Sequence, residues 1–559
     1  MLNPTQAQLE IKAHPGLDLL ITAPAGCGKT EALGLRVAGL LSQGAVAAPR
    51  KVLVTTFSNR ARDNIRNRIG THVSPNLMRD RVTIANFHGI SARIFKAHAE
   101  VVGLDPSLLI PESDWVGDEC RRQRVNFNAA GAAGELLRTI KQEAVDDATV
   151  MEQLEAAGNR LAIRLETLRI SEGRLTYDDL PRVAELILAH DEVADVYRNH
   201  FAAVIVDEFQ DLTPQQLRIV NRIGSGKTTY AGDLAQGIYR FAGARPQEVY
   251  AAITEECGTT IELNESHRSS PNVLQVVNAL SCLTTGTPLK AADPDSWPGG
   301  GIAAVLDYPT VEKESAGLLV ICRYILSKAP NQRIGVISRT GARRRFVDEA
   351  VAGSDLPWYR WEDGVFDTET ARILKVVLPR LDRKAYDGAD DPVAYLRQAV
   401  DFDGIQDPAT REGLASAITW CVDLLNEGNT PAEIRARVRV GDQTTLLNIP
   451  GVHLLNAHVG KGQQFDWVLI VGAEDGSIPF FLAQDSPSRQ EEARIFGVMM
   501  SRARHGVVVS HAAAVPAQDG RVFNKEPSPF LVQLREAVAD RRGFRDWLER
   551  ADWDAISAR

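Results

Sequence analysis

The chain has 559 residues, of which 44% are hydrophobic and 24% charged, the composition of a globular protein long enough for three or four domains. No apolar run approaches the ~18 residues that a membrane span needs, and the start, MLNPTQAQLE, lacks the basic and apolar regions of a secretory signal. The six cysteines are scattered without a CxxC pair, which argues against a zinc site and a disulfide framework. A cytoplasmic protein is expected.

The net charge of −9 does not by itself indicate a nucleic-acid partner. Net charge is a poor guide when binding is confined to one cleft, because local basic clusters set the field there. Three such clusters occur, at 60–68 (RARDNIRNR), 121–124 (RRQR) and 342–346 (ARRRF). Each alone is typical of a solvated helix face, and it gains meaning only beside a strand-binding groove.

Short apolar runs predict buried parallel strands in two groups. The first group is LDLLIT (17–22), KVLVTT (51–56), AAVIVD (202–207) and TTYAGD (228–233), and the second is IAAVLD (302–307), IGVIS (334–338), VHLLNA (452–457), WVLIVG (467–472) and VVVS (507–510). Stretches between the strands of each group indicate helices. The pattern predicts an α/β fold with two doubly wound domains, each carrying a mostly helical insertion.

The expected boundaries follow from this pattern. They are a first domain at 1–90 and 200–270, its insertion at 91–199, a second domain at 271–344 and 451–535, a reduced insertion at 345–450, and a C-terminal helix or tail at 536–559.

The first predicted strand leads into a loop of small residues and then into a helical pattern. The loop is Ala23-Pro24-Ala25-Gly26-Cys27-Gly28-Lys29-Thr30. Small residues let backbone N–H groups cradle phosphates at the start of a helix. In this arrangement Lys29 reaches the β- and γ-phosphates and the Thr30 hydroxyl binds Mg²⁺. The sequence therefore predicts an ATP site, although Ala23 stands where the pattern usually has glycine.

A second GSGKT at 224–228 is interpreted differently. It follows a helix whose start is marked by Thr213 as N-cap, Pro214 and Gln216, and strand-like sequence comes after it. Helix and strand are in the wrong order to cradle a phosphate. We expect no nucleotide there.

Two adjacent acids follow the strand AAVIVD. Asp207 is expected to hold Mg²⁺ through its carboxylate, and Glu208 to orient or deprotonate the attacking water. Adjacent acids after a strand are often only a solvated turn. Together with the loop at 23–30, they predict ATP hydrolysis.

At DEFQD (207–211) the sequence comes to resemble the UvrD/Rep/PcrA family of superfamily 1 helicases. The other segments that carry the resemblance are LNPTQ (2–6), APAGCGKT (23–30), TTFSNRARDNIRNRI (55–69), NFHGISARIF (86–95), AGDLAQGIYRFAGA (231–244), LNESHRSS (263–270), IGVISRT (334–340), HVGKGQQFDWVLIVG (458–472), EEARIFGVMMSRAR (491–504) and PSPFL (527–531). The resemblance spans nearly the whole chain and implies two RecA-like P-loop domains with mostly helical insertions.

The resemblance also implies roles around the nucleotide. Gln6 lies where the family reads the adenine, and Gly462 and Gln464 belong to the segment near the sugar. Gln236 is expected to couple the γ-phosphate to the strand groove. Arg268 and Arg502 hold the two positions from which arginines stabilise transition-state charge, a task that suits the planar guanidinium.

The same resemblance implies strand contacts. Aromatic faces for successive bases are expected at Phe57, Tyr239 and Phe241, and phosphate contacts at Asn59, Arg60, His88, Arg339 and His458. Stacking on a base is worth ~1–3 kcal/mol and depends little on sequence. Taken singly, aromatic residues more often belong to the core.

Three departures from the family pattern bear on function. Ala242 replaces the arginine of RGA, Gln464 replaces an acid near the sugar, and His267 replaces the tyrosine of YRS. The insertions are also compact for this family, and the overall form resembles short family members such as the helicase-like subunit of the Gabija anti-phage system. These features bear more on processive unwinding than on ATP hydrolysis.

Two functions remain open at this point. The first is a 3′→5′ DNA translocase or helicase that acts on single-stranded, tailed or nicked DNA, with ATP and Mg²⁺ as cofactors. The second is an NTPase subunit that senses DNA ends or single strands and regulates a partner protein such as a nuclease. A plain P-loop kinase or transferase would not need the segments after residue 330.

Overall fold

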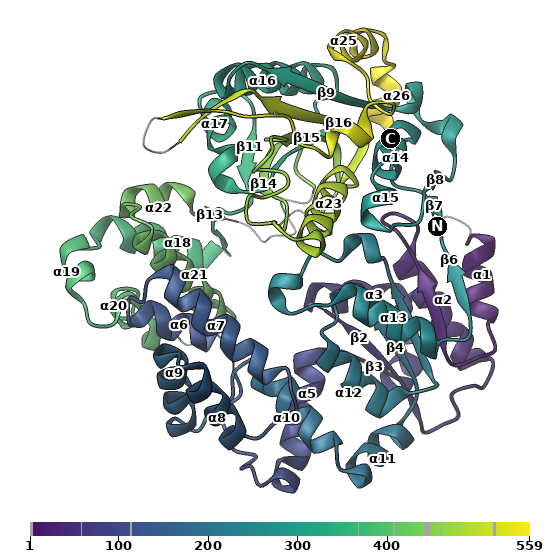
Figure 1. Cartoon of the computed structure of the whole chain (residues 1–559), viewed down its shortest axis with the longest axis vertical. Coiled ribbons are helices and arrows are strands. Elements are labelled where there is room, and N and C mark those ends of the chain that lie inside the picture. The colour runs from purple at the N-terminus through teal and green to yellow at the C-terminus, as the bar shows by residue number, and fades with distance from the viewer. Residues whose placement is uncertain are drawn as a thin grey trace.

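The computed structural model describes residues 4–57, 59–111, 114–366, 368–405, 408–440, 448–459, 461–517 and 521–559. Figure 1 shows two α/β lobes, a first lobe at the lower right and a second lobe at the top, with helical units in blue and green on the left. The two lobes are built on separate six-stranded sheets. The α/β class with parallel sheets and helical insertions is confirmed.

The first sheet has the strand order β3-β2-β4-β5-β1-β6, and every pair is parallel. Its strands are β1 (Leu19–Thr22), β2 (Lys51–Thr56), β3 (Val82–Asn86), β4 (Phe201–Asp207), β5 (Thr228–Gly232) and β6 (Thr260–Glu262). One face packs on α1 (Gln6–Ala13), α2 (Lys29–Ser42) and α3 (Asn59–Gly70). The other packs on α5 (Phe87–His98), α10 (Asp179–Leu188), α11 (Asp191–His200), α12 (Pro214–Gly224) and α13 (Pro246–Glu256).

The second sheet has the order β11-β14-β10-β15-β16-β9 and is also parallel. Its strands are β9 (Ile302–Tyr308), β10 (Arg333–Ser338), β11 (Trp358–Arg360), β14 (Gly451–Asn456), β15 (Phe465–Val471) and β16 (Ala503–Ala512). One face packs on α14 (Pro271–Asn278) and α23 (Ser486–Met500), and the other on α16 (Val311–Lys328), α17 (Gly341–Ala352), α25 (Arg541–Arg550) and α26 (Trp553–Ala558).

All nine strands predicted from apolar runs are present, and three further strands, β3, β6 and β11, complete the sheets. Each of these three lies at a sheet edge. Their side chains are less fully buried than those of the central strands. An edge strand is covered on fewer sides, so its sequence need not be a continuous apolar run. The apolar-run criterion therefore missed them.

The first insertion has its own small core, formed by α6 (Trp115–Arg122), α7 (Phe127–Lys141), α8 (Asp147–Ala157) and α9 (Arg160–Ser171). Helices α10 and α11, inside the range expected for this insertion, pack on the first lobe instead. The second insertion contains α18 (Thr368–Val377), α19 (Arg383–Gly388), α20 (Pro392–Ala399), α21 (Pro408–Asn426), α22 (Pro431–Arg437) and the parallel pair β12 (Val365–Phe366) and β13 (Arg439–Val440).

Short elements connect these units. They are α4 (Pro75–Arg81), β7 (Glu265–Ser266), β8 (Lys290–Ala291), α15 (Ser281–Thr284), β17 (Ala514–Pro516), β18 (Val522–Asn524) and α24 (Leu531–Leu534). No helix in the described ranges combines the length and apolar character needed to cross a membrane.

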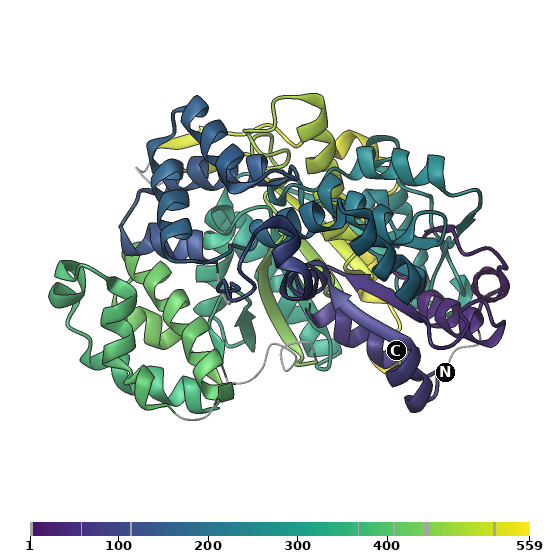
Figure 2. The ribbon, with the colours of Figure 1, turned by 90° about the horizontal axis from the view of Figure 1, so that it is seen from below.

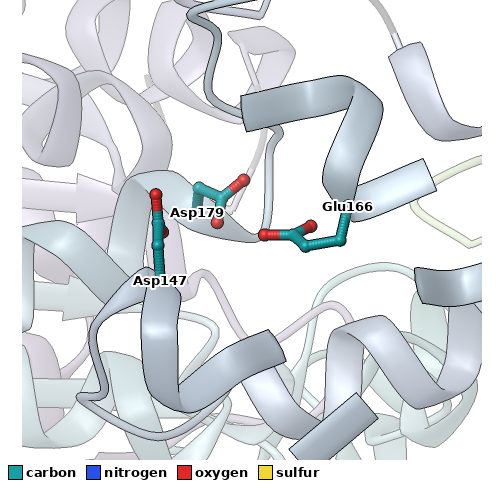
Figure 3. A group of neighbouring side chains, drawn as sticks. All are labelled: Asp147, Glu166 and Asp179. Carbon is teal, nitrogen blue, oxygen red and sulfur yellow. The ribbon is translucent and has the colours of Figure 1, made fainter. Parts of the chain in front are cut away.

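Three carboxylates meet where the first insertion adjoins the start of α10, those of Asp147, Glu166 and Asp179 (Figure 3). Three cations neutralise them. Lys141 pairs with Glu166 at 2.7 Å and with Asp179 at 2.9 Å, while Arg169 and Arg182 pair with the same group of acids. Burial alone would raise the pKa of Asp179, but the three cations hold that pKa well below its usual value. The cluster is an ion-pair network in which the cations occupy the coordinating oxygens, and we assign no metal to it.

The second GSGKT lies where the sequence analysis expected, between a helix and a strand. Thr213 and Gln216 form a capping box at the start of α12. Lys227 follows the helix, and its ammonium donates to the backbone carbonyls of Arg198 and Phe201 at 2.7 Å each. Its charge therefore stabilises the turn between α11 and β4.

A Lys227→Ala variant is accordingly expected to bind and hydrolyse ATP like the wild type, with only a modest loss of stability from the two lost hydrogen bonds. Nucleotide affinity and thermal unfolding, measured on the same preparation, check this. A folded variant that no longer binds nucleotide would contradict the interpretation.

Candidate active site

The loop from Ala23 to Thr30 connects β1 to the first turn of α2. Two glycines in it have left-handed backbone conformations, Gly26 with φ +89° and Gly28 with φ +76°. A Cβ on Gly26 would lie 2.6 Å from the Cβ of Arg268, and one on Gly28 would lie 2.5 Å from the Nε2 of Gln8. Both positions therefore need glycine for conformation and for space. The loop leaves the N-terminus of α2 open toward the cleft, as a phosphate cradle requires.

Lys29, at the start of α2, contacts both acids that follow β4. Its Nζ bonds to Asp207 and lies 2.8 Å from Glu208 Oε1. Glu208 itself has φ +60°, and its other oxygen accepts from the Gln210 amide at 2.6 Å. Burial would raise the pKa of Glu208, but Lys29 and Lys461 lower it to about 2. Glu208 is therefore ionised at neutral pH, as a residue that orients or activates water must be.

Arg268 lies on a segment that is hydrogen-bonded to both lobes. The backbone N–H of His267 donates to Gly26 of the loop at 3.0 Å, and the Ser269 hydroxyl donates to the carbonyl of Ala503 at 2.6 Å. With its amide oriented so that both polar atoms are satisfied, Gln464 accepts from Arg268 Nη2 at 3.1 Å and from Nε at 3.3 Å. A neutral amide, and not a carboxylate, thus holds this guanidinium.

Arg502 approaches the cleft from the end of α23. Its Nε donates to the carbonyl of Val498 at 2.9 Å, and its Nη2 donates to the Ser501 hydroxyl at 2.8 Å. Burial, reinforced by the charge of Arg268, lowers the pKa of Arg502 to about 9, and burial lowers that of Arg268 to about 10. Both guanidiniums stay charged at neutral pH. Within the described part of the chain, neither forms an ion pair with a carboxylate.

These groups line one cleft of about 600 Å³ between the lobes. It extends from the loop and the acid pair to two aromatic rings, Phe57 at the end of β2 and Tyr239. The rings stack with centroids 5.2 Å apart and planes 12° apart, and Phe57 is 40% exposed. Most of the predicted nucleotide groups and two of the predicted base-stacking rings thus line a single cleft.

Lys461 is a site residue that the sequence analysis missed, although it stands in the quoted segment HVGKGQQF. Its Nζ lies 2.8 and 2.7 Å from the two carboxylate oxygens of Asp211 and 2.9 Å from the carbonyl of Gln236. It also lies 4.4 Å from the Tyr239 ring centroid. Burial raises the pKa of Asp211 to about 6 despite this partner. One ammonium from the second lobe therefore touches the acid segment, the Gln236 turn and the aromatic pair together.

Gln6 and Gln8, both on α1, have different surroundings. Gln6 is exposed, donates to Glu10 at 3.2 Å and is not among the residues that line the cleft. Gln8, two residues further, is buried and donates to the carbonyl of Gly28 at 3.3 Å. It also accepts from the Thr5 backbone as part of a capping box. Gln8 therefore supports the phosphate loop, while the adenine role of Gln6 stays a prediction.

The remaining strand candidates fall into two places. Arg339 donates to Glu492 through Nε and Nη2 at 2.8–3.1 Å and lies 3.2 Å from His458. Burial and the neighbouring cations lower the pKa of His458 to about 4, so it is neutral at pH 7. His88 packs edge-on against Tyr177, with centroids 5.3 Å apart. The side chains of Asn59, Arg60 and Phe241 lie outside the described part of the structure.

Gly462 and Gln464 line the same cleft, and Gly462 has φ +84°. Gln236 donates to Asp233 Oδ2 at 2.9 Å. The structure thus brings together Lys29, Thr30, Asp207, Glu208, Gln236, Arg268, Gly462, Gln464, Arg502, Phe57 and Tyr239 as lining residues.

Comparison with known proteins points to the same family that the sequence motifs resemble. Residues 3–256 match the profile of the UvrD/REP helicase N-terminal domain, and residues 432–514 match that of the UvrD-like helicase C-terminal domain. The ATP-dependent DNA helicase UvrD2 of Mycobacterium tuberculosis is 24% identical over 580 aligned positions, which cover 94% of this chain and 80% of the relative. DNA helicase II of Escherichia coli is 22% identical over 97% of this chain and 89% of the relative.

Proposed function

Because this chain belongs to the UvrD/Rep family of superfamily 1 helicases, we propose that it is an ATP-dependent DNA helicase that moves 3′→5′ along single-stranded DNA. One observation carries the proposal: the cleft that holds the phosphate loop and the acid pair also holds the guanidiniums of Arg268 and Arg502, which have no carboxylate partner among the described residues, and it reaches the stacked rings. Nucleotide chemistry and strand contact share one space. We also propose that the protein acts in the cytoplasm, the location expected from the sequence.

The nucleotide half of the cleft suits a triphosphate. A buried cation without a counterion is costly, and a phosphate group would relieve that cost for both Arg268 and Arg502. Lys29 already lies where its charge is needed, but its partners are Asp207 and Glu208. Binding of a triphosphate would exchange those carboxylate contacts for phosphate contacts. The acids would then be free for metal binding and water activation.

The donor set also fits Mg²⁺. Thr30 and Asp207 line the cleft and offer a hydroxyl and a carboxylate oxygen, the ligand type that Mg²⁺ prefers. Bound there, the ion would supply charge neutralisation for the phosphates. The chain's own residues do the rest: Glu208 orients the water, Lys29 holds the phosphates, and the guanidiniums of Arg268 and Arg502 stabilise the charge that develops during transfer.

Strand contact is coupled to this chemistry through Lys461. Its ammonium touches Asp211, four residues after Asp207, and also the Tyr239 ring that stacks on Phe57. Closure of the lobes around ATP would move Lys461 relative to both. We propose that this contact passes the nucleotide state to the base-stacking rings.

Replacing Phe57 by alanine is expected to weaken binding to single-stranded DNA roughly tenfold, with little preference among base sequences, because stacking on one base is worth ~1–3 kcal/mol. Strand-stimulated ATPase should fall at subsaturating DNA. Fluorescence anisotropy with oligonucleotides of different sequence measures the effect. The matched control is Val320→Ala on α16, because Val320 is also apolar and is 63% exposed. Unchanged affinity of Phe57→Ala for single-stranded DNA would mean that the ring serves packing and does not stack on bases.

Strand displacement on 3′-tailed and 5′-tailed duplexes tests the function itself. We expect strand-stimulated ATPase and short unwinding that starts from the 3′ tail. Preference for the 5′ tail would reject the direction. Stimulated ATPase without any unwinding would favour the second candidate, an NTPase subunit that regulates a partner nuclease.

A further inference from the structure

The basic cluster RARDNIRNR at 60–68 is only partly explained by the nucleotide cleft. Arg68 lines that cleft and lies 3.0 Å from a carboxylate oxygen of Glu31. Arg66 is exposed, and among the described residues no carboxylate pairs with it. It lines a second hollow, of about 630 Å³, which shares no lining residue with the cleft. We call this hollow the β3 groove.

The β3 groove lies where α3, α4 and the edge strand β3 meet, and its floor is apolar. The apolar residues that line it are Val73, Pro75, Met78, Val82 and Ile84. Val82 and Ile84 also belong to the core beneath α3, so the floor is continuous with the interior of the first lobe. An apolar hollow of this size at the surface is a feature of binding sites.

The charges around the β3 groove are positive. Arg66 contributes from α3 and Arg79 from α4, and of the described residues that line the groove none is acidic. Arg79 lies 3.0 Å from its neighbour Asp80, but both side chains are more than half exposed, so this pair contributes little. The chain as a whole carries a net charge of −9. The groove therefore suits a ligand that combines carboxylates with apolar side chains.

The edge of β3 is the longest uncovered edge of the two sheets. β3 has five residues and ends the first sheet, and within the described ranges no strand or bridge pairs with its outer side. β6 and β11 have three residues each. The edge of β9 is covered, since the Ala539 N–H donates to Ala303 at 2.8 Å. An uncovered edge offers backbone donors and acceptors to an added strand.

The position of the groove separates it from the expected nucleic-acid contacts. Phe57 and His88 follow the C-terminal ends of β2 and β3, whereas the groove lies beside the first half of β3, at Val82 and Ile84. All of its lining residues belong to the first lobe. Figure 2 shows the purple segments of this lobe at the right and the green helices of the second insertion at the left. A phosphate backbone would also gain nothing from the apolar floor.

We propose that the β3 groove is a docking site for an extended acidic segment of a partner protein, which adds to the first sheet as a further strand beside β3. Carboxylates of the segment pair with Arg66 and Arg79, and its apolar side chains cover Val73 and Met78. The inference does not depend on the proposed function, because the groove and the nucleotide cleft are separate.

Binding of a fluorescein-labelled peptide of glutamate and valine residues to the full-length protein tests the proposal by anisotropy. The wild type should bind this peptide, with an affinity that falls as salt is raised. Arg66→Glu with Arg79→Glu should weaken binding about tenfold or more, because two attractions become repulsions. Arg542→Glu, at an exposed position of α25 in the second lobe, is the matched control and should bind like the wild type.

Two further peptides separate docking from a loss of folding and from simple charge attraction. A peptide with lysine in place of every glutamate should bind the double variant and not the wild type, which a misfolded variant could not do. A glutamate peptide with proline at alternate positions keeps the charge but cannot donate the backbone hydrogen bonds of a strand. It should bind the wild type more weakly. Equal binding of the proline peptide would contradict strand addition.

The other occupants of the groove are outcomes of the same experiment. If single-stranded or duplex DNA displaces the peptide and loses affinity in the double variant, the groove binds nucleic acid and the proposal is wrong. A wild-type dimer in sedimentation that the double variant lacks would assign the groove to a second copy of the chain, which also overturns it. Absence of peptide binding by the wild type has the same consequence. Strand-stimulated ATPase, measured alongside, should be unchanged in the double variant, and its absence in the wild type would contradict the proposed function alone.

Discussion

Removing the guanidinium of Arg502 is expected to lower strand-stimulated ATP hydrolysis by about 10³-fold or more, the usual effect of losing an arginine that stabilises phosphoryl transfer. Arg502 is buried in the wall of the cleft that Lys29 also lines, carries a full charge at neutral pH and has no carboxylate partner among the described residues. Its side chain therefore has positive charge to offer to a transferring phosphate. ATP affinity should change much less than turnover, because the loop at 23–30 supplies most of the ground-state contacts.

Three further variants help to separate an effect on turnover from an effect on ATP binding. Arg502→Lys should not restore turnover, because a lysine ammonium lacks the planar, forked donors of arginine. Lys29→Ala should abolish hydrolysis, and Glu208→Gln should bind ATP but fail to turn it over. Single-turnover hydrolysis and equilibrium binding of a fluorescent nucleotide measure the two quantities separately. Turnover close to that of the wild type in Arg502→Ala would remove this residue from the catalytic groups.

Replacing Lys141 by methionine should destabilise the first insertion by ~3–5 kcal/mol, the cost of leaving buried charges without their partner. The Lys141 side chain is 1% exposed, and its ammonium lies between Glu166 and Asp179. Methionine fills similar space but leaves these two carboxylates short of one cation (Figure 3). Urea unfolding, followed by a probe on α8 or α9, measures the loss.

Two comparisons make the measurement specific. Arg372→Ala breaks an exposed pair with Glu369 and should cost less than ~1 kcal/mol. Adding Glu166→Gln to Lys141→Met should recover part of the stability, because it removes one of the stranded charges. Since the pKa of Asp179 is lower in the folded insertion than in the unfolded chain, the network stabilises at neutral pH, and this contribution is lost as pH falls into the acid range. If Lys141→Met loses no more stability than Arg372→Ala, the buried carboxylates do not depend on Lys141 for their stability.

Features that depend on neighbouring residues could be predicted from the sequence. Apolar runs located the nine more fully buried strands, because a strand covered on both faces has few polar positions. The loop at 23–30 was recognisable because its backbone needs glycine at Gly26 and Gly28. The order of helix and strand was enough to set Lys227 apart from Lys29. Each of these features depends on residues within one or two turns of each other.

Other features were decided only by tertiary structure, because their partners are far apart along the chain. Lys461 meets Asp211 across 250 residues, and Arg124 meets the end of α19 across more than 260. Gln8, and not Gln6, supports the phosphate loop because the turn of α1 directs it inward. No periodicity encodes such pairs. They arise when two helices, strands or loops that are distant in sequence pack together. Each buried charge then needs a partner, because an unpaired buried charge is costly.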